Sequence, residues 1–315
     1  MALFFMAVFA DLCYCFNMEI IRASVLGFCF GVRRAVDLAE KAIIENARGG
    51  NFGNENNNYN GKRNVYSLGP LIHNEKALVD LTNKGLEIID EKDVAAIPGR
   101  SVVIVRAHGV ASKIITMLEL KECVVIDATC PRVKASQKMV EKYTYNDDFV
   151  IISGDRDHGE MKGIAGYAGR NFIQIQNAEE ARQLDFSLFE NKSVILMSQT
   201  TYSVDEFEKI EQVLRSKIRN LAVMNTICPA TNERQTALLE LCKKVEGVLV
   251  IGGKNSANTK RLYQTAQLHC KKAAHIQSAA DIPDDFFRLS SVGITAGAST
   301  PDRIIDEVEE RLKRG

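Results

Sequence analysis

The chain has 315 residues, of which 46% are apolar and 25% are charged, a composition that excludes a fibrous or wholly disordered protein. Its 40 Lys and Arg residues balance 40 Asp and Glu residues, which argues against a general nucleic-acid or anionic-membrane binder. The eight cysteines are too few and too scattered for a disulfide scaffold. The length allows two or three modules.

The first 17 residues are mostly apolar but resemble neither a membrane span nor a secretory signal. Asp11 interrupts the run MALFFMAVFA, which is shorter than the roughly 18 apolar residues that cross a bilayer. No Lys or Arg precedes Arg22, whereas a secretory signal begins with positive charge. We interpret residues 1–17 as an extension before a fold that starts at Met18, with a weak membrane-proximal anchor as the alternative. We expect no stable membrane insertion.

Three similar segments recur along the chain, each with a cysteine after an apolar run and before a predicted helix. The segments are SVLGFCFGV, VVIDATCPRV and AVMNTICPAT, and their cysteines are Cys29, Cys130 and Cys228. The cysteines are 101 and 98 residues apart. Such regular spacing is typical of an internal repeat.

Two further elements accompany each cysteine. The first is a strand followed by a glycine, a polar loop and a helix; its glycines are Gly69, Gly154 and Gly252. The second is a β-branched strand and a small polar loop, found as SVVIVRAHGV, SVILMSQTTY and SVGITAGAST. The first copy is longer because of the Asn- and Gly-rich segment 47–62, which we interpret as an inserted surface loop.

Alternating strands and helices of this kind predict parallel βαβ units. We therefore predict an α/β fold of three modules related by a pseudo-threefold axis, a trefoil. The expected modules are residues 18–123, 124–221 and 222–315.

The three repeated cysteines are predicted to meet near this axis, because loops at the carboxyl ends of parallel strands gather ligand groups. Three thiolates could hold zinc with a fourth ligand, or an iron–sulfur cluster with one open iron. A lone cysteine is more often a buried small apolar residue, and we interpret Cys123, Cys242 and Cys270 in that way.

Polar loops open the other predicted helices. Backbone N–H groups at helix starts, together with Ser, Thr, Asn and His side chains, bind phosphate, although Ser, Thr and Asn also serve as ordinary helix caps. Neither a GxxxxGK[ST] loop nor a GxGxxG loop follows a strand, so nucleotide-binding motifs are not supported. The loop residues are His73, Asn74, His108, His158, Glu160, Gln199, Thr200, Thr201, Asn255, Ser256, Asn258 and Ser299.

The HGE triplet at residues 158–160 is the best candidate for acid–base chemistry. A carboxyl group shielded from water has a raised pKa and can act as a proton source. The alternative is an ordinary first-turn Glu160 stabilised by the helix dipole.

These motifs closely resemble the 4-hydroxy-3-methylbut-2-enyl diphosphate reductase family, also called IspH or LytB. Eight segments occur in the family's order between Cys29 and Pro301: GFCFGV, GPLIHN, RAHGV, DATCP, SQTTYSVDEF, ICPATNERQ, KNSANTKRL and TAGASTPD. The resemblance implies a trefoil around a [4Fe–4S] cluster with three Cys ligands and an open iron. It also implies reductive removal of the substrate's allylic hydroxyl in non-mevalonate isoprenoid synthesis, with isopentenyl and dimethylallyl diphosphate as products.

The resemblance also implies roles for individual residues. Glu160 resembles the family's proton source, supported by Thr200 and His158. Two positions depart from the family pattern: Ala257 stands where a second Ser is common, and Gly159 stands where Pro is frequent, which we expect to make the Glu160 loop more mobile. The implied cluster ligands are Cys29, Cys130 and Cys228. The implied substrate contacts are His73, His108, His158, Thr200, Thr231, Ser256, Ala257, Asn258 and Ser299.

Three other functions remain open from the sequence. A cluster-dependent dehydratase would need no external electrons, an iron–sulfur sensor would bind a phosphorylated ligand without turnover, and a structural zinc site would need a fourth ligand. For the reductase, family analogy implies an external donor, ferredoxin or flavodoxin, because no flavin or nicotinamide motif is present. Cluster thiolates require a reducing compartment, so we expect a bacterial cytoplasmic protein.

Overall fold

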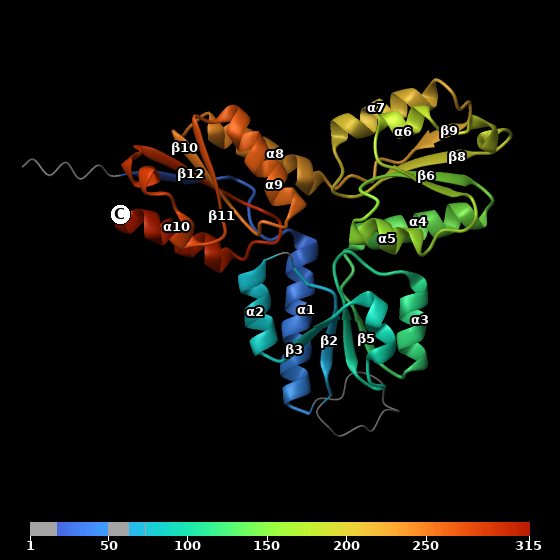
Figure 1. Cartoon of the computed structure of the whole chain (residues 1–315), viewed down its shortest axis with the longest axis horizontal. Helices are drawn as coiled ribbons and strands as arrows, with labels where there is room; N and C mark the ends of the chain where they lie inside the picture. The colour runs from blue at the N-terminus through green and yellow to red at the C-terminus, as the bar shows by residue number, and fades with distance from the viewer. Residues whose placement is uncertain (1–17, 50–62, 73) are drawn as a thin grey trace, which may run out of the picture.

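The computed structural model describes residues 18–49, 63–72 and 74–315. The predicted extension 1–17 and most of the predicted insertion 47–62 lie outside these ranges. Three modules surround a common centre (Figure 1). Each holds a four-stranded sheet in which all the described pairings are parallel. The prediction of three α/β modules is confirmed.

The first module has helices on both faces of its sheet. Small residues at helical spacing on α1, including Ala35 and Ala39, pack with Ile104 on one face. Leu118 of α3 packs on the other face. The elements are α1 (Phe30–Ala47), β2 (Val65–Leu68), α2 (Glu75–Asn83), β3 (Leu86–Ile89), η1 (Glu91–Ala96), β4 (Val102–Val105), α3 (Ser112–Leu120) and β5 (Val124–Asp127).

The second module repeats this arrangement. Helices α4 and α5 cover one face, where Val140 and Met161 pack with Ile152. Helices α6 and α7 cover the other face, where Phe207 packs with Ile151. The elements are α4 (Pro131–Tyr145), β6 (Phe149–Ser153), α5 (Gly159–Ala165), β7 (Phe172–Ile175), α6 (Ala178–Arg182), η2 (Phe186–Phe189), β8 (Val194–Ser198), α7 (Val204–Arg215) and β9 (Leu221–Val223).

The third module includes the first strand of the described residues, β1. Leu238 of α8 and Leu262 of α9 pack with Val250 on one face of the sheet, and Val308 of α10 packs with Ile294 on the other. The elements are β1 (Glu19–Arg22), α8 (Pro229–Cys242), β10 (Gly247–Ile251), α9 (Ala257–His269), β11 (Lys272–Ile276), η3 (Ala279–Asp281), η4 (Asp284–Arg288), β12 (Ser291–Ala296) and α10 (Asp302–Arg314).

The three sheets have equivalent strand orders: β3-β2-β4-β5, β7-β6-β8-β9 and β11-β10-β12-β1. Strands β2, β4, β6, β8 and β10 are buried along their whole length. Helices on both faces explain why they read as continuous apolar runs rather than alternating ones. Cysteines outside the repeat pack with the cores: Cys123 in the first module, Cys242 and Cys270 in the third.

The fourth strand of each sheet connects one module to the next. β5 begins directly after residue 123, the predicted end of the first module, but it pairs with β4 of that module. β9 spans residue 221, the predicted end of the second module, and pairs with β8. β1 pairs with β12 and so completes the last sheet. Each sheet therefore takes its fourth strand from the repeat that follows it, and β1 closes the ring. Helices that begin beyond these strands, α1, α4 and α8, pack on the next sheet. No helix in the described ranges is both long and apolar enough to cross a membrane.

Candidate active site

The three repeated cysteines lie at these connections between modules. Each caps the start of a long helix: Cys29 caps α1, Cys130 caps α4 and Cys228 caps α8. In each case the cysteine N–H donates to a carbonyl oxygen in the loop after β12, β4 or β8, so the repeat extends to single hydrogen bonds. The pairs are Cys29 with Ala298 (3.2 Å), Cys130 with Ala107 (2.9 Å) and Cys228 with Thr200 (2.7 Å).

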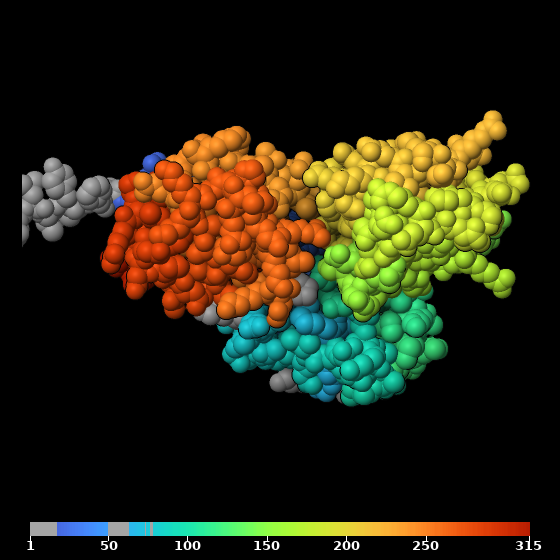
Figure 2. All heavy atoms as spheres, turned by 45° about the horizontal axis from the view of Figure 1, so that its top comes forward, coloured from blue at the N-terminus to red at the C-terminus, as the bar shows by residue number. Residues whose placement is uncertain are grey.

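A cavity of about 210 Å³ lies where the modules meet, and Figure 2 shows the surface hollowed between them. It contains every predicted site residue that the structure describes; His73 lies outside the described residues. Two other polar loop residues, Asn74 and Gln199, are buried but do not line it. The predicted residues in its lining are Cys29, Cys130, Cys228, His108, His158, Glu160, Thr200, Thr231, Ser256, Ala257, Asn258 and Ser299.

The cysteines are free thiols and partly exposed. Burial raises the pKa of the Cys130 thiol, and the nearby Cys29 and Cys228 raise it further. Gly31 makes room for this thiol, because a Cβ at Gly31 would lie 2.7 Å from the Cys130 Sγ. In the described ranges, no group of three His, Cys, Asp or Glu side chains is arranged around the position of a metal ion.

Glu160 is 1% exposed and lies in the first turn of α5. One carboxylate oxygen accepts the Thr200 backbone N–H at 2.7 Å, and the other accepts the Thr200 hydroxyl at 2.9 Å. Burial raises the Glu160 pKa to about 7, and the two hydrogen bonds from Thr200 hold it below what burial alone would give. The carboxyl group can therefore carry a proton near neutral pH.

Two histidines lie beside Glu160. His158 caps α5, and its Nδ1 accepts the Glu160 backbone N–H at 3.2 Å. Its ring meets that of His108 edge to face, with the centroids 5.0 Å apart. His108 belongs to the first module and His158 to the second, so the pair spans their junction.

Helix α9 supplies the third module's side of the cavity. Ser256 caps the helix by accepting the Thr259 N–H at 3.3 Å. The Asn258 Nδ2 is buried and has no hydrogen-bond partner among the described residues. This unpartnered donor, at a helix start that favours negative charge, is suited to an anionic ligand.

Four charged residues in the lining were missed by the sequence reasoning: Arg132, Asp155, Arg234 and Arg261. Arg261 joins two modules, because its Nη1 donates to the Thr201 carbonyl oxygen at 2.5 Å and its Nη2 lies 3.7 Å from Asp155. Arg234 sits in the predicted ICPATNERQ segment, so its position there was a signal that could have been used.

Arg234 is a buried cation beside the cysteines. It is 3% exposed, and its Nη2 donates to the Gly27 carbonyl oxygen at 2.8 Å. Its Nε is buried and has no hydrogen-bond partner in the described part of the chain. Burial lowers the Arg234 pKa, whereas Cys29 and Cys228 act to raise it. Arg234 thus places positive charge among the thiols and ties α8 to the loop before Cys29.

Gly159 and Gly69 lie on either side of the Arg106 guanidinium. A Cβ at Gly159 would lie 2.8 Å from its Nη2, and a Cβ at Gly69 would lie 2.7 Å from its Nη1. Glu91 holds the same guanidinium at 2.6 Å. A side chain at position 159 would therefore crowd Arg106.

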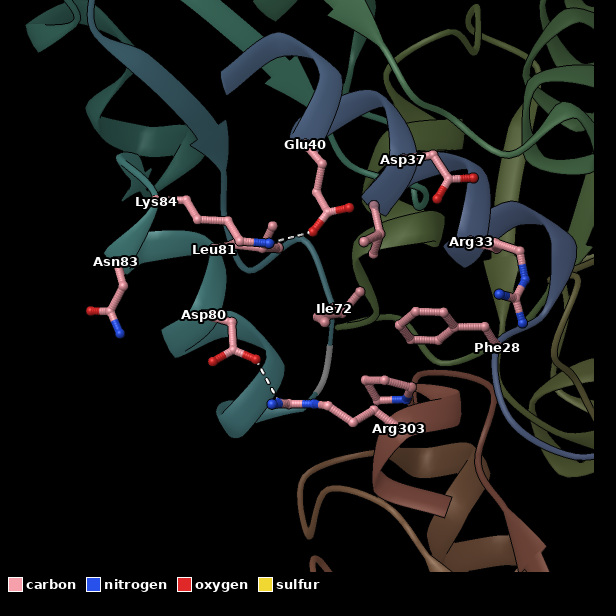
Figure 3. Close-up of a pocket in the computed structure, with 12 residues that line it drawn as sticks. Phe28, Arg33, Asp37, Glu40, Ile72, Asp80, Leu81, Asn83, Lys84 and Arg303 are labelled. Atoms are coloured by element: carbon pink, nitrogen blue, oxygen red, sulfur yellow. Dashed lines mark hydrogen bonds and ion pairs between the residues drawn. The ribbon is translucent and has the colours of Figure 1, made fainter. Parts of the chain in front are cut away.

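A larger hollow of about 660 Å³ lies between α1, α2 and the start of α10 (Figure 3). Ion pairs Lys84–Glu40 and Arg303–Asp80, both at 2.7 Å or less, cross its walls. Among the described residues, its lining includes Phe28 and Arg33 but no cysteine or histidine. We therefore assign the chemistry to the smaller cavity.

Fold and site together define a protein of three parallel α/β modules that share one polar cavity, bordered by three free thiols and a buried carboxyl group. A cysteine at a helix start, with its backbone hydrogen bond to the neighbouring loop, recurs at all three module junctions. The chain belongs to the LytB protein family, whose model matches residues 20–313.

Relatives of known name support this membership. The chain is 47% identical over 302 residues to the 4-hydroxy-3-methylbut-2-enyl diphosphate reductase of Treponema denticola, covering 95% of this chain and all of the relative. A solved (E)-4-hydroxy-3-methyl-but-2-enyl diphosphate reductase, described as the terminal enzyme of the non-mevalonate pathway, is 34% identical with a TM-score of 0.72 and covers 95% of this chain and all of its own.

The solved E-1-hydroxy-2-methyl-but-2-enyl-4-diphosphate reductase from Plasmodium falciparum is 26% identical with a TM-score of 0.79, covering 93% of this chain and 87% of its own. These similarities confirm the family and the oxidoreductase class predicted from the sequence.

Proposed function

We propose that this chain removes the allylic hydroxyl of 4-hydroxy-3-methylbut-2-enyl diphosphate by reduction, giving isopentenyl and dimethylallyl diphosphate. The reaction consumes two electrons and two protons and releases one water. The observation that carries the proposal is the meeting of three free cysteines and a buried, protonatable Glu160 in one cavity. The names of the relatives support the substrate.

Cys29, Cys130 and Cys228 would hold a [4Fe–4S] cluster. The residues fit such a group because each cysteine occupies the N-cap position of a helix whose start favours negative charge, Gly31 leaves room at Cys130, and Arg234 offsets thiolate charge. Three ligands would leave one iron open, where the cluster would supply electrons and Lewis acidity.

The diphosphate would bind on the wall formed by α9 and neighbouring loops. Asn258 would donate its unpartnered amide, and Ser256 and Ser299 line the same wall. His108 and His158 would donate from the first and second modules, and Thr231 would border the reacting end. His73 stays a prediction. These donors can balance a diphosphate without a dedicated metal.

Glu160 would provide a proton. Its pKa of about 7 leaves it substantially protonated at neutral pH, and Thr200 fixes its position through two hydrogen bonds. His158 would support delivery by holding the start of α5. A ferredoxin or flavodoxin would bring the electrons from outside, and the reducing conditions that free thiols require favour the bacterial cytoplasm.

The test is anaerobic purification followed by measurement of iron, acid-labile sulfide and zinc per chain, and of turnover with dithionite-reduced methyl viologen. Iron with equal sulfide, lost in Cys130→Ser, and electron-dependent product formation are expected. Electron-independent loss of water would indicate a dehydratase instead. Ligand binding without turnover would indicate a sensor, and zinc without sulfide after reconstitution would indicate a structural site.

A further inference from the structure

A second groove lies between Arg34 of α1, the end of β5 and the outer side of α4, and two of its lining residues, Thr129 and Pro131, flank Cys130 in the chain. Its volume is about 270 Å³, and its lining shares no residue with the three-cysteine cavity. The first turn of α1 lies at the centre of the molecule, where the modules meet (Figure 1). The groove is lined by Arg34, Asp127, Thr129, Pro131, Lys134, Ala135 and Lys138.

Exposed residues also directly follow two of the repeated cysteines in the chain. Phe30 directly follows Cys29 and is 73% exposed, and Pro131 directly follows Cys130 and is exposed. The next residues of the same helix turns, Gly31 and Arg132, line the inner cavity instead. A protein seated on the outside would therefore approach the cysteines without entering the substrate cavity.

Residues on this outside surface fall into two helical stripes. Phe30 and Arg34 are four residues apart on α1, while Pro131, Lys134 and Lys138 have three- and four-residue spacing on α4, so each set shares a helix face. The Arg34 guanidinium donates to the Asp127 and Thr129 carbonyl oxygens, each at 3.3 Å. Arg34 thereby fixes the first stripe against the loop that carries Cys130. We call these five residues the α1–α4 face.

The α1–α4 face is positively charged within a chain whose net charge is zero. The groove has three basic residues, Arg34, Lys134 and Lys138, and one acidic residue, Asp127. Asp127 pairs with Lys134. Lys134 is still about half exposed in that pair, and Lys138 is exposed. Along α4, Arg132 and Lys142 add to the basic side, and Glu141 is its one acidic residue.

We propose that the α1–α4 face docks an acidic, one-electron carrier protein, with Phe30 and Pro131 as its apolar centre and Arg34, Lys134 and Lys138 as its cationic rim. The inference rests on the proposed reductase function. Each turnover breaks one C–O bond with two electrons and two protons and forms one water, so two reduced carriers dock in succession and each is oxidised by one electron. Exposed aromatic centres with charged rims are typical of such interfaces.

The experiment compares two reductants with the same holoenzyme variants. In the Lys134→Glu/Lys138→Glu double variant, the KM for photoreduced flavodoxin is expected to rise roughly tenfold at low ionic strength, and the difference should shrink with added salt. Turnover with dithionite-reduced methyl viologen, which needs no docking surface, should match the parent. Iron content, measured first, verifies that cluster loading is equal.

Lys209→Glu is the matched control, because Lys209 is an exposed lysine on α7, which covers the opposite face of that sheet from α4. An unchanged KM for flavodoxin in the double variant, or an equal loss with both reductants, would overturn the docking face. Failure of the parent with methyl viologen would instead overturn the proposed function. In that case, calorimetry of oxidised flavodoxin binding tests the α1–α4 face. Tenfold weaker binding by the double variant than by the parent supports the docking face, and equal binding overturns it.

Discussion

Thr200 holds both oxygens of the Glu160 carboxylate, one through its backbone N–H and one through its hydroxyl. The same Thr200 accepts the Cys228 N–H through its carbonyl oxygen. One residue therefore fixes the buried acid and a repeated cysteine relative to each other. The position of Glu160 depends on the loop after β8 as well as on its own helix.

Glu160→Gln should abolish most turnover while leaving substrate binding intact, because the amide keeps the shape but provides no acidic proton. General acid catalysis contributes about 10²- to 10⁴-fold, so a loss in this range is expected in kcat with methyl viologen as reductant. Parent turnover should decline as pH rises through about 7, where Glu160 loses its proton. Near-parent turnover by the variant would refute the acid role.

Thr200→Val should move this alkaline decline to higher pH. The hydroxyl donates to the charged form of Glu160, so its removal favours the protonated form, whereas the backbone N–H remains. Thr200→Ser keeps the donor and serves as the control. Turnover measured from pH 6 to pH 9 tests this prediction. An alkaline decline at the same pH in the parent, Thr200→Val and Thr200→Ser would contradict it.

The free energy of unfolding should depend on pH because the Glu160 pKa is raised in the folded protein. The folded-state pKa of about 7 lies above the ordinary 4.5, so the stabilisation is full below about pH 4.5 and is lost as pH rises through about 7. The span corresponds to roughly 3 kcal/mol. Urea unfolding of the holoprotein at pH 5 and pH 8 should show this loss in the parent but not in Glu160→Gln; parallel curves would contradict the shift.

Gly159→Ala should destabilise the protein by about 1–3 kcal/mol, the usual cost of overpacking. Its Cβ would meet an Arg106 guanidinium that is already confined by Gly69 and Glu91. Arg106→Lys should relieve the cost, because its slimmer end leaves space beside position 159. A double-mutant cycle by urea unfolding measures this coupling, and additive effects would show that Arg106 is not the obstacle.

Arg234→Gln should lower the reduction midpoint of the cluster, since a buried cation beside Cys29 and Cys228 stabilises an added electron. A shift of about 60 mV corresponds to a tenfold change in a one-electron equilibrium, and we expect at least that. Arg234→Lys should stay closer to the parent. Redox titration followed by electron paramagnetic resonance measures the midpoint, and Arg132→Gln is the control. Equal midpoints in Arg234→Gln and the parent would exclude the electrostatic role of Arg234.

Ala257→Ser should tighten substrate binding. Ala257 is the first residue of α9 and lines the cavity beside Ser256, so a hydroxyl there can add one hydrogen bond to the diphosphate. Such a bond contributes about 0.5–1.5 kcal/mol, which corresponds to a two- to tenfold lower KM. The kcat should change little, and an unchanged KM would place the diphosphate elsewhere.

The repeat made the architecture predictable. Cysteines at equivalent positions predicted both the three modules and the meeting of Cys29, Cys130 and Cys228, because equivalent positions in similar modules must occupy equivalent places. Exchange of strands was not predictable in this way. The run VVID reads as the beginning of a repeat, whereas its pairing with β4 depends on which strand lies next to it in space.

The buried Arg234 and the partly buried Arg106 escaped prediction for a related reason. Arg106 and Arg234 look like ordinary surface residues in the sequence, since arginine is seldom buried without partners. Their burial depends on glycines and carbonyl groups from distant segments, such as Gly159 for Arg106 and Gly27 for Arg234. The ICPATNERQ motif could draw attention to Arg234, but local patterns do not reveal which distant segments such an arginine contacts.

The pairing of β1 with β12 has a consequence for synthesis on the ribosome. Residues Glu19–Arg22 are synthesised long before their sheet partners, Ser291–Ile294. Ion pairs from Arg22 to Asp306 and Glu309 of α10 form equally late. Such long-range contacts slow folding, so the third module can close only after β12 and α10 have emerged. Until then, β1 has no strand to pair with, and the ring of modules stays open.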